Sequence, residues 1–198
     1  MKKNFINAEE LMLDAYRLGV NIYQDGFRPD FIIGLWRGGS PVGIGVQDCL
    51  EYLGVDTDHI SVRTSYSGMS RYSEMISEEN SIRVHGLQYV FDTISHDDAL
   101  LIVDDVFSSG LSMQAVIDRL ASKARRNMPT DIRIATPWYK PGKNRTERKP
   151  DYYLHETEDW LVFPYELDGL SMDELRVQKP NVLEMINEVV AALPDSQS

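Results

Sequence analysis

The sequence predicts an α/β protein with a mostly parallel central sheet flanked by helices. Short apolar runs, which are typical of buried strands, alternate with longer segments in which apolar residues recur at helical spacing. Clusters of glycine and proline separate these segments and mark turns. The resulting order is strand, helix, strand, helix, strand, and strands joined by helices in this way pair in parallel.

The first expected helix begins near Asn7, whose side chain can cap it, with Glu10 placed to reach back, and it stops near Gly26. Four apolar residues recur at helical spacing between these points: Leu11, Ala15, Leu18 and Ile22. Further strands are expected at 31–35, 60–64, 99–103 and 132–136, with one or two short strands within 81–91 and another at 152–155. Further helices are expected at 41–53, at 111–127 and near 182–192. The polar segment 64–80 has no clear period and is expected to be a long exposed loop.

Composition bounds the class of protein. The chain has 198 residues, which fits a single domain over 1–198, with a core at about 28–158 and a C-terminal segment at about 159–198. Twenty basic and 31 acidic residues give a net charge of −11, so neither nucleic acid nor an anionic membrane is an expected partner. No apolar run approaches the roughly 20 residues that span a bilayer. With no secretory signal at the N-terminus and one cysteine, Cys49, a cytoplasmic location is expected.

Two adjacent carboxylates, Asp104 and Asp105, directly follow the expected strand at 99–103. Such a pair can hold ribose hydroxyls or the hydration shell of Mg²⁺, because hard cations prefer oxygen ligands. Alternatively, the pair merely ends a strand. A response-regulator receiver also has paired acids after its first strand, but 103 residues precede this pair, and Asp131 opens a strand rather than ending one.

A small, hydroxyl-bearing turn follows the carboxylates and opens the helix at 111–127. Unpaired amides and the macrodipole at a helix N-terminus favour a phosphate group. Ser108, Ser109 and Ser112 can add hydroxyl donors, and Gly110 allows close approach of the backbone. The alternative is that the serines only cap the helix.

The segment Val103–Ser112 resembles the phosphoribosyl-diphosphate signature of type I phosphoribosyltransferases. Four other segments of the chain resemble further motifs of this family and occur in the family's order along the sequence. Gly34–Gly39 resembles the pyrophosphate loop, and Ser65–Tyr66 resembles the start of the flexible loop that closes over the site. Lys140–Pro141 lies where oxopurine-using members place the lysine that reads the base, and Trp160–Glu166 resembles the tail that stacks on it. The likeness covers roughly residues 28–168, is closest to xanthine–guanine and hypoxanthine phosphoribosyltransferases, and implies a small hood formed by the C-terminal segment.

The resemblance implies a role for each matching residue. Asp104 and Asp105 would hold the ribose hydroxyls, directly or through Mg²⁺. Arg37 and Gly38 would bind pyrophosphate, next to a cis peptide bond between Trp36 and Arg37. The 5′-phosphate would bind to Ser108, Ser109, Gly110, Leu111 and Ser112. Lys140 would contact a purine carbonyl oxygen, Trp160 and Leu161 would contact the base, Glu166 would lie near the base and the metal, and Tyr66 would belong to the lid.

Several of these residues also have ordinary interpretations. Arg37 suits a surface turn, Tyr66 suits an exposed surface, and Trp160 suits a partly buried core position. Lys140 lies among five cations in ten residues, and the other four, Lys143, Arg145, Arg148 and Lys149, are expected to lie in a solvated loop.

One position departs from the oxopurine-using pattern. Those relatives place a third acid three residues after the second Asp, where this chain has Ser108. A neutral hydroxyl cannot act as a general base near pH 7, so another group such as Glu166 would have to accept the proton of the base. Orotate- and adenine-using branches also lack this acid, so the substitution is compatible with transferase chemistry.

The expected function is therefore transfer of a phosphoribosyl group from phosphoribosyl diphosphate to guanine, xanthine or hypoxanthine, with Mg²⁺ as cofactor and release of pyrophosphate. Asp104, Asp105, Arg37 and Tyr66 are the expected catalytic residues, and Asp104, Asp105 and Glu166 are the expected metal ligands. Alternatives are a regulatory protein of the same fold that binds the activated sugar, and a transferase for another acceptor. The resemblance also implies a homodimer or homotetramer.

Overall fold

The computed structural model describes residues 2–66 and 82–192 and separates into two compact units. The larger unit is Ala8–Glu158, and the smaller one combines Met1–Asn7 with Asp159–Ser198. The single-domain organisation stays a prediction.

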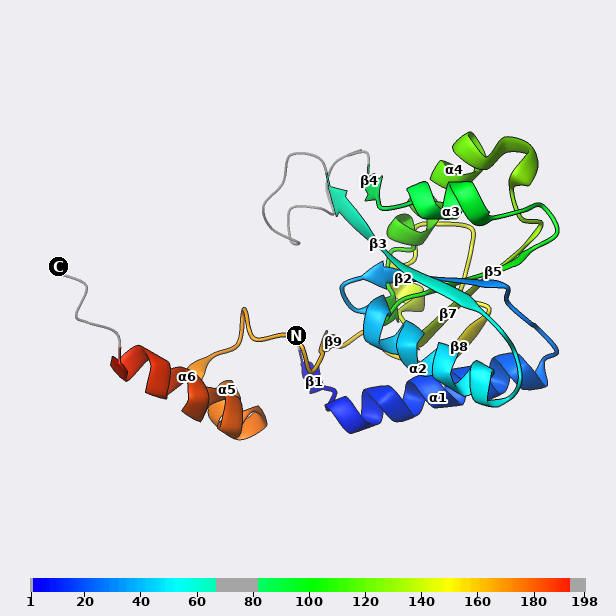
Figure 1. Ribbon diagram of the computed structural model, residues 1–198. Coiled ribbons are helices and arrows are strands. Elements are labelled where there is room, and N and C mark those ends of the chain that lie inside the picture. Colours follow the sequence, from blue (N-terminus) through cyan, green and yellow to red (C-terminus); the bar gives the residue numbers. More distant parts are fainter. Residues whose placement is uncertain (1, 67–81, 193–198) are drawn as a thin grey trace. The chain divides into compact units, whose positions relative to one another are not determined.

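The larger unit is built on a mixed sheet of seven strands (Figure 1). Its strands are β2 (Phe31–Trp36), β3 (Asp58–Tyr66), β4 (Ile82–His85), β5 (Ala99–Val103), β6 (Val106–Phe107), β7 (Asp131–Tyr139) and β8 (Tyr152–Glu156). The spatial order is β4-β3-β2-β5-β7, with β6 extending the line of β5 along one edge of β7 and β8 paired to its other edge. Every pairing is parallel except that of β3 with β4, which confirms the predicted sheet.

Helices cover both faces of this sheet (Figure 1). One face carries α1 (Ala8–Gln24) and α2 (Gly39–Tyr52), and the other carries α3 (Gln88–Thr93) and α4 (Leu111–Ala124), which a 3₁₀ turn at Arg125–Asn127 continues. The four apolar residues that predicted α1 are all buried. Beneath α3 and α4 the core includes Leu35, Val62, Ile102, Val116 and Leu120, so the helix predicted at 111–127 packs its apolar face on the sheet.

Three expected boundaries differ from the structure because neighbouring strands extend or replace the predicted elements. β3 continues through Thr64 and Ser65 to Tyr66, since β4 pairs with its last four residues. β7 runs past Thr136 to Tyr139, because β6 and β8 hold its end on both edges. The segment 81–91 contains one strand, β4, and then α3 instead of a second strand. The rest of the predicted 64–80 loop lies outside the described residues.

In the smaller unit, β1 (Lys3–Phe5) pairs in parallel with β9 (Trp160–Val162). Two helices follow β9, namely α5 (Met172–Gln178) and α6 (Pro180–Ala192). Ser171 and Glu174 form a capping box at the start of α5, and Lys3 Nζ forms an ion pair with Glu174 at 2.8 Å. The helix expected near 182–192 is confirmed as α6, whereas β1 and α5 were not expected. Within the described residues, no helix is both long and apolar enough to cross a membrane.

Candidate active site

The predicted site residues of the larger unit gather where β2 and β5 lie side by side. These two strands are parallel, with Gly34 opposite Val103, so their carboxyl ends point in the same direction. The helices that follow them, α2 and α4, cover opposite faces of the sheet (Figure 1). In open α/β sheets, ligands bind beyond the carboxyl ends of strands at such a reversal of strand order. The fold therefore brings the Arg37 turn and the acidic pair to one edge.

Asp104 and Asp105 occupy the short break between β5 and β6. The main chain keeps its register across the break, because the Asp104 amide donates to the Ala135 carbonyl oxygen at 3.2 Å. The Asp105 amide donates to Asp104 Oδ1 at 2.9 Å. Burial of the Asp104 carboxyl, reinforced by the neighbouring Asp105 carboxylate, raises the pKa of Asp104 well above its ordinary value of 3.8. A cation or a hydrogen-bond donor that reaches the pair would oppose this shift, because it favours the ionised carboxylate.

The turn after β2 lies directly against this acidic pair. The Gly39 amide donates a hydrogen bond to the Asp104 carboxyl group. A Cβ atom at Gly39 would overlap the carbonyl oxygen of Val103 and would lie 3.0 Å from Asp104 Cα. The position thus requires glycine, because no larger residue permits this approach of the two backbones.

Arg37 and Gly38 link β2 to α2. The peptide bond between Trp36 and Arg37 is cis, as the resemblance predicts. Gly38 is the N-cap of α2 and provides no side-chain cap. The Gly39 amide is used by Asp104, the Ser40 amide donates to the Arg37 carbonyl oxygen at 3.3 Å, and Pro41 has no amide hydrogen. The Gly38 amide and the exposed Arg37 are therefore the candidate donors for an anion in this turn.

The predicted phosphate turn leads from β6 into α4. Gly110 is the N-cap of α4 and has a left-handed conformation with φ of 74°. A Cβ atom at Gly110 would lie 2.6 Å from both Phe107 Cζ and Thr146 Oγ1. The Leu111 amide donates to Ser109 Oγ over a long 3.4 Å. Buried Phe107 supports the turn from below, edge-on to Tyr139 with ring centroids 5.7 Å apart.

The segment after β7 is attached to the phosphate turn through its main chain. The Lys140 amide donates to the Phe107 carbonyl oxygen at 2.9 Å, and the Arg145 amide donates to the Ser109 carbonyl oxygen at 3.0 Å. Asn144 Oδ1 accepts hydrogen bonds from the Thr146 amide at 2.9 Å and from Thr146 Oγ1 at 3.0 Å. Neither Asn144 nor Thr146 was singled out by the sequence, although Asn followed two residues later by Thr is typical of a side-chain-stabilised turn.

Two further cations beside the Arg37 turn were not expected. Arg63 lies opposite Trp36 on one side and His85 on the other, and Arg83 lies opposite Ser65. Both arginines are exposed. The alternation of polar residues around buried Val62 was the signal that could have placed Arg63 on an exposed face.

The remaining predicted site residues belong to β3 and to the smaller unit. Tyr66 is the last residue of β3. In the smaller unit, Trp160 pairs with Lys3 and is 46% exposed, and Leu161 is buried. Glu166 Oε2 accepts a hydrogen bond from the Phe163 amide at 3.1 Å, and its own amide donates to the Phe163 carbonyl oxygen at 3.0 Å. Glu166 therefore closes a local turn in its unit.

The donor set around Asp104 and Asp105 fits Mg²⁺. Within the described residues, no group of three or more His, Cys, Asp or Glu side chains could hold a metal ion. Mg²⁺ does not need such a cage, because it keeps several waters and is usually bound through one or two carboxylates together with substrate phosphates. Two adjacent carboxylates beside a phosphate-binding turn match this coordination.

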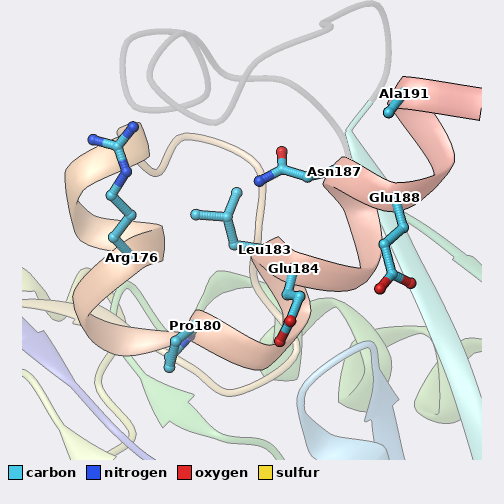
Figure 2. A pocket seen from close by; sticks show the side chains of 7 residues that line it. All are labelled: Arg176, Pro180, Leu183, Glu184, Asn187, Glu188 and Ala191. Atoms are coloured by element: carbon cyan, nitrogen blue, oxygen red, sulfur yellow. The ribbon is translucent and has the colours of Figure 1, made fainter.

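A hollow of about 550 Å³ lies between α5 and α6 in the smaller unit (Figure 2). It is lined by Arg176, Pro180, Leu183, Glu184, Asn187, Glu188 and Ala191. Arg176 forms an ion pair with Asp173 at 2.9 Å. None of the predicted site residues lines this hollow.

Comparison with known proteins identifies the family. Residues 3–169 match the model of the phosphoribosyl transferase domain, and the chain belongs to this family. No curated protein matches the chain.

Solved structures confirm the α/β fold. A purine phosphoribosyltransferase from Pyrococcus horikoshii Ot3 is 25% identical, with a TM-score of 0.62, and the match covers 86% of this chain and 99% of that one. A hypothetical protein from Neisseria gonorrhoeae with bound ppGpp is 17% identical, with a TM-score of 0.67, over 87% and 93% of the two chains. The Helicobacter pylori xanthine–guanine–hypoxanthine phosphoribosyltransferase is 18% identical, with a TM-score of 0.60, over 84% and 95%.

Proposed function

We propose that this protein is an oxopurine phosphoribosyltransferase that acts in purine salvage. It would transfer the phosphoribosyl group of phosphoribosyl diphosphate to guanine, xanthine or hypoxanthine. The observation that carries the proposal is the meeting of the Arg37 turn, the acidic pair and the phosphate turn at the junction of β2 and β5. Membership of the phosphoribosyltransferase family and the likeness to purine-using enzymes support it.

In this reaction, a ring nitrogen of the base forms a bond to C1′ of the sugar while the bond from C1′ to the pyrophosphate oxygen breaks. The bonding electrons leave with pyrophosphate, and the base loses the proton of its N–H group. Negative charge therefore grows on the leaving group in the transition state. Arg37 and the Gly38 amide would stabilise that charge, because the turn that carries them is held in place before the reaction begins.

Asp104 and Asp105 would hold the ribose hydroxyls, and the amides and hydroxyls of Ser108–Ser112 would hold the 5′-phosphate. Mg²⁺ bound near the acidic pair would neutralise charge on the diphosphate. Lys140 would contact a carbonyl oxygen of the base. Fixing the sugar at both ends would confine C1′ close to the base nitrogen, which is the main benefit of binding two substrates in one site.

The other proposed contacts involve Tyr66 at the end of β3 and residues of the smaller unit. Trp160 and Leu161 would contact the base, Glu166 would lie near the base and the metal, and Tyr66 would belong to a lid that excludes water from the activated sugar. The protein would act as a homodimer or homotetramer. Light scattering after gel filtration measures this assembly directly.

Ser108 favours a second candidate, a regulatory protein of the same fold. In place of the third acid the chain has a hydroxyl that cannot accept the proton of the base. A similar structure, the Neisseria gonorrhoeae protein, binds ppGpp, which carries two diphosphate groups. A site made of helix N-termini and arginines would suit such a ligand without supporting turnover.

A nucleobase screen distinguishes the candidates. The protein is incubated with phosphoribosyl diphosphate, Mg²⁺ and each base in turn, and pyrophosphate release and the ultraviolet spectrum of the base are followed. Turnover with an oxopurine is expected, and its loss in Asp105→Asn would assign the activity to this site. Tight calorimetric binding of the activated sugar or of ppGpp, without pyrophosphate release with any base, would favour the regulator. Failure to bind any of these ligands would overturn both candidates.

A further inference from the structure

The loop at 140–149 has a charge opposite to that of the rest of the protein. It contains five cations and one acid, Glu147, which gives a net charge of +4. The whole chain has a net charge of −11, so the remaining residues together carry −15. A field of that sign repels a ligand that carries several phosphate charges and slows its association.

The main chain and two polar side chains determine where this loop lies. Besides the bonds from Lys140 and Arg145 to the phosphate turn, Asn144 Nδ2 donates to the Arg148 carbonyl oxygen at 2.8 Å. Thr146 Oγ1 lies 3.2 Å from that oxygen and 3.0 Å from Asn144 Oδ1, so its single proton can be donated to either acceptor. These bonds fold the loop back on itself, so Arg148 stays close to the residues that touch Ser109 and Gly110.

Three cations of the loop have no structural use of their own. Lys143, Arg148 and Lys149 are exposed, and none forms an ion pair with any residue of 2–66 or 82–192. The hydrogen bonds given above for the loop use its main chain and the Asn144 and Thr146 side chains, and none uses the side chain of Lys143, Arg148 or Lys149. Glu158 accepts from the Gly142 amide at 2.7 Å, so this acidic contact also falls on the main chain. The repulsion among the cations is therefore not explained by folding.

These cations lie within reach of an anion on the phosphate turn. Each is at most four residues from Arg145, whose amide contacts that turn, and a residue spans at most about 3.6 Å. The hydrogen bonds to the Arg148 carbonyl oxygen keep the loop compact beside the phosphate turn, where charges act over distances of the order of the Debye length, roughly 10 Å at 0.1 M salt. At this range they act on an approaching ligand without contacting it in the bound state.

We propose that Lys143, Arg148 and Lys149 form an electrostatic guide that draws phosphoribosyl diphosphate through the acidic field of the protein to the phosphate turn. The proposal rests on the proposed function and adds a role in association to it. The guide acts on the rate of capture, so it changes kcat/KM for the charged sugar and leaves kcat and the KM of the uncharged base unchanged.

The test compares two triple variants with the same change in charge. Lys143→Gln/Arg148→Gln/Lys149→Gln removes the guide. Arg119→Gln/Lys123→Gln/Arg126→Gln removes three exposed cations toward the other end of α4 and its 3₁₀ turn. Arg119 lies nine residues along the chain from Gly110, which is about 13 Å at the helical rise, and the other two cations lie farther away. Circular dichroism confirms that both variants are folded.

The rate of capture is measured as kcat/KM for phosphoribosyl diphosphate, and by stopped-flow fluorescence, over a range of ionic strength. At low salt the guide variant should be roughly tenfold slower than the wild type, and the difference should shrink to less than about twofold near 0.5 M salt, where screening is strong. The control should follow the wild type throughout. A single reversal, Lys149→Glu, should lower the rate in the same way and serves if the triple variant is unstable.

The two proposals can fail separately. If the wild type captures the activated sugar but the guide variant shows the same rate and salt dependence as the control, the guide is overturned and the proposed function stands. If the wild type neither binds nor turns over the activated sugar, the proposed function fails, and the guide fails with it.

Discussion

Gly39 and Asp104 connect the Arg37 turn to the acidic pair, because the Gly39 amide donates to the Asp104 carboxyl group. The two backbones lie so close that a Cβ atom on Gly39 would overlap the Val103 carbonyl oxygen. We expect Gly39→Ala to push the start of α2 away from β5. The loss of stability should be about 1–3 kcal/mol, as in other overpacked sites. Because the donors for pyrophosphate move with α2, kcat/KM should fall by at least about 10², the effect of a misplacement of about 1 Å.

A matched control separates the two effects of this substitution. Gly54 has φ of 84°, and a Cβ atom there meets no atom within 4 Å. Gly54→Ala should therefore cost stability through backbone strain alone, about 1–2 kcal/mol, while kcat/KM stays unchanged. Urea unfolding and initial rates on both variants check this. Equal activity losses in the two variants would mean that the Gly39 contact has no specific role in the site.

Asp104→Asn should increase stability near neutral pH and abolish activity. Burial raises the pKa of Asp104, so the folded protein binds more protons than the unfolded one between pH 3.8 and the folded-state pKa. The stabilising contribution of Asp104 is thus present below pH 3.8 and is lost as the pH rises through the folded-state pKa. The amide of asparagine is neutral and can still accept the Gly39 hydrogen bond.

The expected rise in Tm at pH 7.5 is about 2–4 °C, which corresponds to about 1 kcal/mol in a protein of this size. Calorimetry at pH 4.5 and pH 7.5 measures it, and the gain should shrink at the lower pH. Asp97→Asn is the control, because the Asp97 side chain is almost fully exposed. A lower Tm for Asp104→Asn at pH 7.5 would show that the acidic pair stabilises the fold and is not under strain for the sake of the site.

Ser108→Asp should increase turnover with oxopurines. A carboxylate at this position could accept the proton of the base, and general base catalysis contributes roughly 10²–10⁴-fold where it is well placed. We expect kcat with hypoxanthine or guanine to rise at least about tenfold, with no gain for adenine or orotate. Ser108→Asn has a similar size without the charge and should give no gain. A uniform loss with every base would show that the Ser108 hydroxyl is needed to hold the 5′-phosphate and cannot be replaced by an anion, which would contradict the expected gain.

The sequence predicted a strand well where the apolar residues of that strand alone indicate that it is buried. Ala99–Val103 was located without error, because five apolar residues end at an acidic pair. The ends of β3 and β7 were missed, because Tyr66 and Tyr139 are strand residues only through pairing with β4, β6 and β8. β1 was not predicted for the same reason, because it is a strand through pairing with β9, which lies far away in the sequence.

The candidate site was predictable where a motif is contiguous and not where the fold assembles it. The acidic pair and phosphate turn form one stretch of sequence, whereas Arg63 reaches the Arg37 turn only through the register of β2 with β3. The sequence predicted a solvated loop around the cations of 140–149, and Lys143, Arg148 and Lys149 are exposed. Its attachment to Ser109 depends on a main-chain hydrogen bond, which side-chain chemistry does not encode.

His59 should make stability depend on pH below about 6.5. Its ring packs between α2 and the sheet, where a Cβ atom at Gly43 would lie 2.8 Å from Nε2 and one at Gly34 would lie 3.0 Å from it. Nδ1 lies 3.1 Å from Gln47 Oε1, and Gln47 Nε2 donates to the Thr57 carbonyl oxygen. Since Gln47 Oε1 is the acceptor, Nδ1 carries the proton, and buried Nε2 has no hydrogen-bond partner among the described residues.

Burial lowers the pKa of His59 and outweighs the opposite effect of Asp58. The unfolded chain therefore binds more protons below the ordinary value of 6.5. The contribution of His59 to stability is fully present above pH 6.5 and is lost as the pH falls through the folded-state pKa, with a slope of at most about 1.4 kcal/mol per pH unit.

His59→Gln cannot titrate, so the difference in unfolding free energy between wild type and variant should change with pH below 6.5 and stay constant above it. Urea unfolding at several pH values measures this difference, and a constant difference throughout would contradict the prediction. If the variant does not fold, the ¹⁵N shifts of the wild-type imidazole provide the same test, because at pH 6.5 they should report a smaller protonated fraction than in a free imidazole, with the proton of the neutral form on Nδ1.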